Sequence, residues 1–269
     1  MSAPVAPLPS PASLEAAPEA AATRRTAPPP DWPSDRLEGP EAKRLLLDAL
    51  AGLVERLERH DGYSAVIRRQ ERVGGRLLAE QTLRMKVRHR PASIYVRNIG
   101  VQDGFEVIFV EGLRDGKLIH HSGGLAGRLL PVLELSPRSP LAMSQSRFPI
   151  TEAGLLSAAR MLRDDCRRDL GEPGASIVLD RLVDPEGHTR YRSRLRYDAP
   201  APGRPFSRVE VLYDPGTFLL REMTFSDWPE APGPGEPLLG GRFVVVEFDP
   251  SAVPSDRDFD ATNPAYDFR

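Results

Sequence analysis

The sequence has little cysteine, few aromatic residues and almost no net charge. Its 269 residues include one cysteine, Cys166, 7% aromatic residues, and 36 basic against 38 acidic residues. A single cysteine can form neither an internal disulfide nor a cysteine-based metal cluster. Three arginines and five acids lie in residues 1–40, so the rest of the chain is neutral. This balance gives no reason to expect a nucleic acid or an anionic membrane as a partner.

Long apolar runs are absent as well. No segment approaches the roughly 18 consecutive apolar residues of a membrane span, so the protein is not expected to cross a membrane. Residues 1–40 hold ten prolines and nine alanines but no apolar core of a signal peptide. This composition predicts a disordered Pro/Ala-rich tail over 1–40, followed by a single domain over 41–269. The remnant of a trimmed signal and a misplaced start are open alternatives for the tail.

Recognisable catalytic and metal-binding motifs are also missing. His120 and His121 are adjacent on a predicted strand, so they point to opposite faces and cannot share a metal ion. Gly112–Lys117 lacks the residues that complete a phosphate-binding loop. Cys166 falls on the apolar face of a predicted helix, which is typical of a buried side chain rather than a nucleophile. We therefore expect no catalytic residue, no cofactor, no metal and no enzymatic activity; an enzyme with unfamiliar residues is the minor alternative.

What the chain does contain is alternation of apolar and polar residues, clearest from Tyr63 to Arg97. Two alternating runs meet at Gly74-Gly75, a pair suited to a two-residue hairpin turn because glycine adopts positive φ without steric cost. The second run pairs an apolar face with a cationic one, which indicates a half-buried antiparallel strand, and a further strand follows Pro91. The residues expected on the apolar face are Leu83, Met85, Val87, Ile94 and Val96.

Two helical segments and more strands complete the pattern. A stripe of apolar residues follows Gly39-Pro40 and predicts a helix that ends near Asp61-Gly62. Thr151 is expected to cap a second helix that runs to about Leu170. The remaining runs predict an α+β domain with a large antiparallel sheet and two main helices. Further strands are expected at Phe105–Glu111, Lys117–His121, Leu129–Leu135, Ser176–Val183, His188–Tyr197, Phe206–Tyr213, Thr217–Trp228 and Arg242–Phe248, with a loop at Pro232–Pro237.

One strand carries a stripe of arginines at positions 190, 192, 194 and 196. A surface for single-stranded nucleic acid would need aromatic residues interleaved with these cations. Tyr191 and Tyr197 fall on the opposite face of the strand. The stripe is therefore interpreted as a solvated, charge-paired outer face rather than a nucleic-acid site.

Several segments resemble a bacterial domain-of-unknown-function family, number 1571. They are Gln70–Gly75, Met85–Asn98, Glu106–Gly124, Arg147–Leu156, Asp227–Glu230 and Asp258–Phe268. That family offers no catalytic residues to carry over. Its organisation is similar to that of periplasmic lipoprotein-sorting carriers, in which a curved, incomplete barrel holds acyl chains on a concave apolar face under helical lids. The resemblance implies a curved half-barrel fold and a location in the periplasm or cell envelope.

Two helices are few for the apolar face of so long a sheet, and an uncovered face leaves a groove or an interface. The first hypothesis is a non-enzymatic cell-envelope binding protein that holds lipid or lipoprotein acyl chains on the concave face. Its partner would be a lipid or a lipidated protein, and the groove would be lined by the five apolar-face residues named above. The competing hypothesis is a protein-interaction or scaffold module with a fully packed sheet and no small-molecule ligand. The ligand's identity and the oligomeric state are not predicted.

Overall fold

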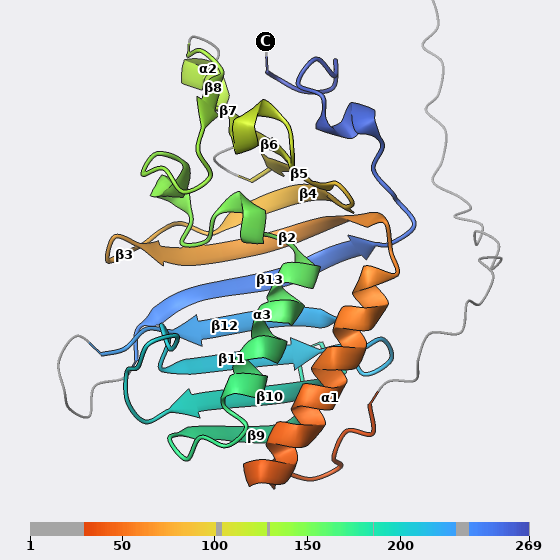
Figure 1. Cartoon of the computed structure of the whole chain (residues 1–269), viewed down its shortest axis with the longest axis vertical. Helices are drawn as coiled ribbons and strands as arrows, with labels where there is room; N and C mark the ends of the chain where they lie inside the picture. The colour runs from red at the N-terminus through yellow and green to blue at the C-terminus, as the bar shows by residue number, and fades with distance from the viewer. Residues whose placement is uncertain (1–29, 101–103, 128–129, 185, 230–236, 269) are drawn as a thin grey trace, which may run out of the picture.

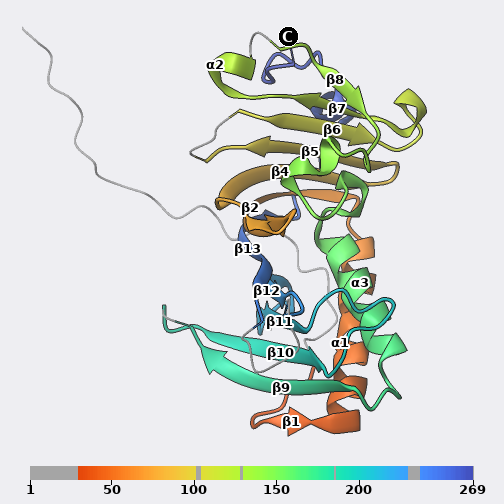
Figure 2. The same ribbon diagram turned by 90° about the vertical axis from the view of Figure 1, so that its left-hand side faces the viewer.

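The computed structural model describes residues 30–100, 104–127, 130–184, 186–229 and 237–268. Most of the expected tail, and most of the loop expected near Pro232, lie outside the described residues. The described strands form one antiparallel sheet of 13 strands in the order β1-β9-β10-β11-β12-β13-β2-β4-β5-β6-β7-β8, with β3 paired to β2. The sheet is curved and open, with β1 and β8 at its edges (Figure 2). The predicted α+β class, with a large curved antiparallel sheet and two main helices, is confirmed.

The strand and helix bounds follow. The strands are β1 (Leu37–Glu38), β2 (Gly62–Val73), β3 (Arg76–Leu77), β4 (Gln81–His89), β5 (Ala92–Asn98), β6 (Glu106–Val110), β7 (Leu118–His121), β8 (Leu133–Leu135), β9 (Ala175–Val183), β10 (Thr189–Tyr197), β11 (Arg208–Tyr213), β12 (Leu220–Ser226) and β13 (Leu239–Asp249). The helices are α1 (Gly39–Glu58), α2 (Gly124–Gly127) and α3 (Leu155–Arg168), with 3-10 turns η1 (Arg114–Gly116), η2 (Ala142–Gln145), η3 (Ile150–Glu152) and η4 (Asp256–Phe259).

Helices α1 and α3 lie side by side on the concave face and run across the strands (Figure 1). They cover β9–β13 and reach β2, whereas β5–β8 lie beyond their ends. The leucines of the predicted stripe in α1 are all buried in the main core. Coverage of the sheet by helices is therefore uneven, and this unevenness positions the site described below.

The hairpin at Gly74-Gly75 forms as predicted, with φ of 55° and 79° at the two glycines. The strand expected after it is interrupted, however, at residues 78–80. The pairs Arg72↔Leu77 and Arg69↔Gln81 leave two residues on β2 opposite three on the other arm. An extra residue on one strand produces a bulge, which divides the predicted second arm into β3 and β4.

The second main helix begins later than predicted. Thr151 lies in the 3-10 turn η3, and α3 starts at Leu155 after Gly154, whose φ is 101°. The first amide of α3, that of Leu155, donates to the hydroxyl of Tyr63 at 2.8 Å. A Cβ at Gly154 would lie 2.8 Å from that hydroxyl, so the position needs glycine. The cap is thus a tyrosine from β2 rather than the local threonine.

Packing of the domain begins before the expected boundary at residue 41. Trp32 is 2% exposed, and its ring stacks on Tyr191 at 5.2 Å between centroids. Its indole N–H donates to the carbonyl of Asp180 at 2.8 Å. Residues 37 and 38 then pair with β9 as strand β1. Proline-rich composition does not reveal this contact, because its partners lie about 150 residues away.

Two further predictions concern the second half of the chain. Arg192 and Arg194 pair with Asp180 at 2.7 and 2.6 Å, which confirms the charge-paired outer face. The strand expected from Thr217 starts only at Leu220, because Phe218 adopts a positive φ of 56° in the turn before β12.

An aromatic cluster and a polar network stabilise the two ends of the fold. On the other face of β5–β7 a second core forms from the C-terminal segment, with Phe259, Tyr266 and Phe268 packed on the sheet.

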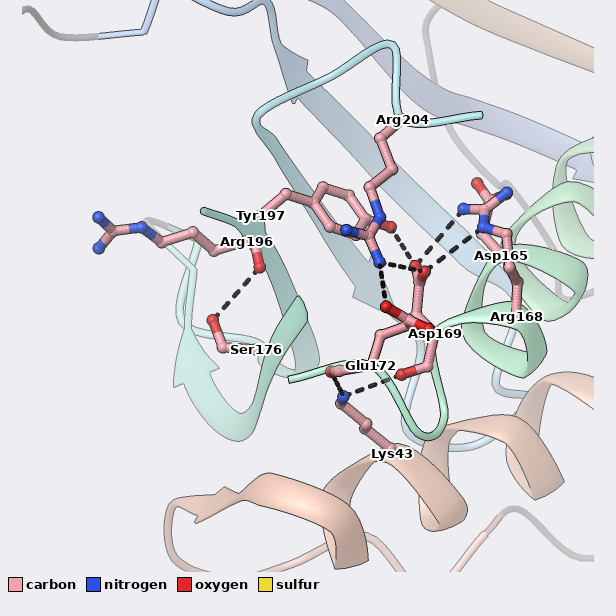
Figure 3. A network of polar contacts seen from close by, with 9 residues as sticks. All are labelled: Lys43, Asp165, Arg168, Asp169, Glu172, Ser176, Arg196, Tyr197 and Arg204. Carbon is pink, nitrogen blue, oxygen red and sulfur yellow. Dashed lines mark hydrogen bonds and ion pairs between the residues drawn. The ribbon is translucent and has the colours of Figure 1, made fainter. Parts of the chain in front are cut away.

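At the end of α3 the carboxylate of Asp169 is fully buried and accepts from Tyr197 at 2.7 Å and from Arg204 at 3.2 Å (Figure 3). Lys43 of α1 donates to the backbone carbonyls of Asp169 and Glu172, so this network joins both helices to the sheet.

Candidate ligand cavity

A cavity of about 400 Å³ lies against the concave face at the start of α3. Strands β2, β4–β7, β12 and β13 form one wall, and the opposite wall comes from residues 137–154 and the first turns of α3. Pockets for small molecules in proteins usually measure roughly 300–1,000 Å³, so the volume suits a ligand. Ser144 and Gln145 line the cavity and are exposed, which places an opening at this loop.

One row of side chains forms the floor of the cavity. Ala65, Met85, Val96, Val107 and His120 are successive cross-strand neighbours on β2, β4, β5, β6 and β7, and all five line it. Four strand spacings separate the first from the last, which corresponds to roughly 19 Å along the sheet. The floor is therefore long, narrow and almost wholly apolar.

Several apolar side chains on this wall are only half-buried. Ile67, Phe105, Val107 and Phe243 line the cavity and are intermediate in exposure, although they face inward from the sheet. On a fully packed sheet such residues would lie under other side chains. Their remaining exposure is to the cavity, so the protein's own core leaves this part of the face unfilled.

The five predicted groove residues are all buried, with exposures of 2–7%. Leu83, Met85 and Val96 line the cavity. Val87 and Ile94 are paired neighbours in the register and belong to the same core cluster, but they are not part of the cavity wall. At that end the start of α3 covers the sheet, since Gly154 lies next to Val87. A role for these residues in holding a ligand stays a prediction.

Sequence reasoning missed a charged pair on the cavity side of β2. Arg69 lines the cavity, its Nε donates to the side-chain oxygen of Gln81 at 2.9 Å, and its Nη1 lies 3.3 Å from Glu71. Glu71 is buried and also accepts from Ser146 Oγ and from the backbone N–H of Arg147, each at 3.1 Å. Burial lowers the pKa of Arg69, and the charge of Glu71 opposes that shift.

A sequence signal for this pair exists in the alternation of β2. Tyr63, Ala65 and Ile67 occupy every second position and face the cavity. The same period brings Arg69 and Glu71 to the inner face two and four residues later. Continuing the alternation through charged residues, instead of ending it at the last apolar one, would have predicted an ion pair inside the sheet.

The two histidines lie on opposite faces, as predicted. His120 lines the cavity beside the ring of Phe105, while His121 is buried on the other face against Phe268. Burial, with a smaller contribution from the charge of His121, lowers the pKa of His120, so its imidazole is neutral near pH 7. Hence the far end of the cavity carries a neutral polar ring, and none of the described lining residues there is a cation.

Two other candidate groups lie outside the cavity wall. Cys166 is buried, as predicted, and burial raises its pKa to about 12, so the thiol is not activated as a nucleophile. Asp184, Glu186 and His188 are close enough to share an ion, but this group is mostly exposed and Asp184 already pairs with Arg190 at 2.8 Å. Neither group supplies chemistry to the cavity.

Comparison with known proteins gives a family and several remotely similar solved structures. The family model described as "Protein of unknown function (DUF1571)" matches residues 60–268, which confirms the predicted resemblance. No curated protein matches the chain. No helix among the described residues combines the length and the apolar character that crossing a membrane requires.

The similar solved structures include three proteins from different bacteria. A DUF1329 family protein from Desulfovibrio piger is 11% identical with a TM-score of 0.41, over 81% of this chain and 97% of that one. A putative outer membrane lipoprotein-sorting protein domain from Vibrio parahaemolyticus is 10% identical with a TM-score of 0.36, over 80% and 97%. The Mycobacterium tuberculosis lipoprotein LppX is 14% identical with a TM-score of 0.42, over 78% and 99%. At these values no function is transferred from these structures.

Proposed function

Because this chain belongs to the DUF1571 family of proteins of unknown function, we propose a function from its own cavity: non-enzymatic binding of the acyl chain of a lipid or lipidated protein. The observation that carries the proposal is the row from Ala65 to His120, a mostly apolar floor roughly 19 Å long that borders the cavity along its whole length. An acyl chain is the common ligand that is long, narrow and apolar, and its burial gains about 0.8 kcal/mol per methylene.

The competing role, a scaffold with a fully packed sheet, is disfavoured by the half-buried residues of the cavity wall. In a packed sheet Ile67, Val107 and Phe243 would be covered by the protein itself, but they border a cavity of about 400 Å³. We place the activity in the cell envelope, where a chain that leaves one membrane must cross water before it reaches another. Fractionation of cells that express the full-length protein tests this location.

The test of binding is titration with a fluorescent fatty-acyl probe. Ala158 of α3 lines the cavity and is half-buried, so Ala158→Trp places a large ring in the unfilled space. We expect wild type to take up the probe and Ala158→Trp to lose uptake at least tenfold, with its Tm within a few degrees of wild type. The same change at exposed Ala51 on α1 is the matched control and should bind normally.

Two results would count against the proposal. A wild-type protein that never takes up the probe would remove the acyl-binding function. Native mass spectrometry of protein purified from its own host gives an independent measurement: a retained lipid supports the carrier, whereas a retained protein with no lipid supports the interaction module. Val107→Phe, which fills the cavity from the sheet side, repeats the blocking test should the tryptophan variant fail to fold.

A further inference from the structure

Polar side chains line the cavity in several places, but among the described residues the one cation of its wall lies at one end. Along β2 its wall passes from Ala65 and Ile67 to Arg69, and the nearby loop contributes exposed Ser144 and Gln145. Arg69 pairs across the sheet with Phe243 on one side and Gln81 on the other, so a cation stands in a row that is otherwise apolar or neutral. Burying a cation is costly unless a negative group stabilises its charge, so the position of Arg69 in this wall is informative.

The acid beside Arg69 is already satisfied by other donors. Glu71 accepts from Ser146 Oγ and the Arg147 amide in addition to its ion pair with Arg69. These donors join β2 to the loop over the cavity, so the carboxylate is occupied with holding that loop. The carboxylate of Glu71 is the one counter-charge of Arg69, and it also accepts hydrogen bonds from two other groups. The guanidinium of Arg69 can therefore still bind an anion that enters the cavity.

Further positive charge lies just outside this end. Arg72 donates to the carbonyls of Gly75 and Leu239 at 2.9 and 3.0 Å, and among the described residues it forms no ion pair. Arg76 lines a small recess with Gln81 and Gln145, the latter shared with the cavity wall, and no described acid pairs with it. Glu222 of β12 also lines the cavity, but Arg242 pairs with it at 2.7 Å, so the three arginines at positions 69, 72 and 76 leave an excess of positive charge over Glu71 at this end.

We propose that Arg69 binds the anionic headgroup, a carboxylate or a phosphate, of an amphiphile whose single chain lies along the floor of the cavity. This inference rests on the proposed function and names its ligand class. The chain would extend from Arg69 toward Val107 and His120, and the headgroup would face the opening at Gln145. The opposite orientation would leave an anion beside apolar side chains and a neutral imidazole, where none of the described lining residues is a cation that could pair with it.

The experiment compares charged and uncharged ligands of one chain length. A saturated fatty acid and its methyl ester compete separately against an uncharged fluorescent acyl probe bound to the full-length protein. We expect the acid to bind about tenfold more tightly than the ester in wild type, the usual worth of a hydrogen-bonded charge. Arg69→Gln should weaken the acid about tenfold and leave the ester unchanged.

Arg68 supplies a matched control. It is the neighbouring residue on β2, faces outward and lies 3.7 Å from Glu80. Arg68→Gln removes the same charge from the same strand without touching the cavity, so it should change neither affinity. Because Arg69→Gln leaves Glu71 without its cation, a second variant combines Arg69→Gln with Glu71→Gln and keeps the test valid should the single variant unfold.

The outcomes separate the headgroup site from the cavity itself. Equal binding of acid and ester to wild type, or an acid affinity that Arg69→Gln leaves unchanged, would overturn the headgroup role while the proposed function stands. If neither ligand displaces the probe, the proposed function fails as well. An alkyl phosphate should compete as the fatty acid does, and inorganic phosphate should not. Competition by inorganic phosphate alone would indicate a site for a free anion and would overturn the inference.

Discussion

The two halves of the concave face carry the same alternation of apolar and polar residues, but they differ in how completely other elements cover them. Over β9–β11, α1 and α3 lie on the sheet and the interior is filled by rings such as Trp32, Tyr213 and Phe218, the last two stacked at 4.3 Å. Over β12, β13, β2 and β4–β7, a loop and the first turns of α3 face the sheet, and a cavity of about 400 Å³ is left. The alternation of a strand sets which side chains face inward, but the element opposite decides whether they are covered.

Simple lengths explain the difference. Helix α1 has 20 residues and α3 has 14, which correspond to about 30 and 21 Å. The path of paired strands spans on the order of 50 Å at the usual spacing. Both helices cross the strands near one end of that path, so neither can reach β5–β8 (Figure 1). The remaining cover must come from residues 137–154, which have no long helix to fill the space.

The sharpest test of this contrast places one carboxylate in each half. Val211 of β11 is fully buried in the filled half, whereas Met85 of β4 is buried but borders the cavity. Val211→Asp should cost more than about 5 kcal/mol and unfold the protein, since its charge has no water and no partner. Met85→Asp can turn its charge toward the cavity, so we expect a folded protein with reduced stability and no acyl-probe uptake. Chemical denaturation and probe binding give both readings; equal unfolding of the two variants would mean that the two halves are packed alike.

A second prediction concerns the aromatic filling of the covered half. Trp32→Ala removes a ring that stacks on Tyr191 and the donor to the Asp180 carbonyl. Removing a buried tryptophan should lower the free energy of unfolding by about 4 kcal/mol. Deletion of residues 1–38 should lower the free energy of unfolding by a similar amount, because it removes this ring together with β1. The measurement is urea denaturation; a truncation that leaves stability unchanged would support the predicted domain boundary at residue 41.

The smallest of the three effects is expected at the buried network that holds the end of α3. Burial opposes ionisation of Asp169, but hydrogen bonds from Tyr197, Arg168 and Arg204 outweigh it and keep its pKa below the ordinary value. Asp169→Asn should therefore cost about 3 kcal/mol at neutral pH.

The pH dependence of that variant follows from the lowered pKa. The stabilisation from Asp169 is present above the pKa of the unfolded state, near 3.8, and is lost as pH falls through the lower folded value. The difference in Tm between wild type and Asp169→Asn should therefore hold from pH 7 to about 5 and shrink below pH 4. A constant difference down to pH 2 would show that the charge of Asp169 is not what stabilises this end.

Local patterns in the sequence determined several features without help from the fold. Positive φ at Gly74-Gly75 follows from glycine's freedom, the buried stripe of α1 follows from helical spacing, and the inner face of β4 follows from period two. The same rule, carried one step further along β2, would have placed Arg69 on the inner face. These features depend only on residues near one another in the chain, which is why spacing predicts them.

Only the tertiary structure decided the start of α3, the burial of Trp32 and the presence of the cavity. Tyr63 caps α3 from 92 residues away, and Trp32 meets a strand about 150 residues later. Which half of the concave face stays open depends on where two helices of fixed length come to rest on a longer sheet. These outcomes depend on contacts between distant segments, so the spacing of residues within any one segment does not predict them.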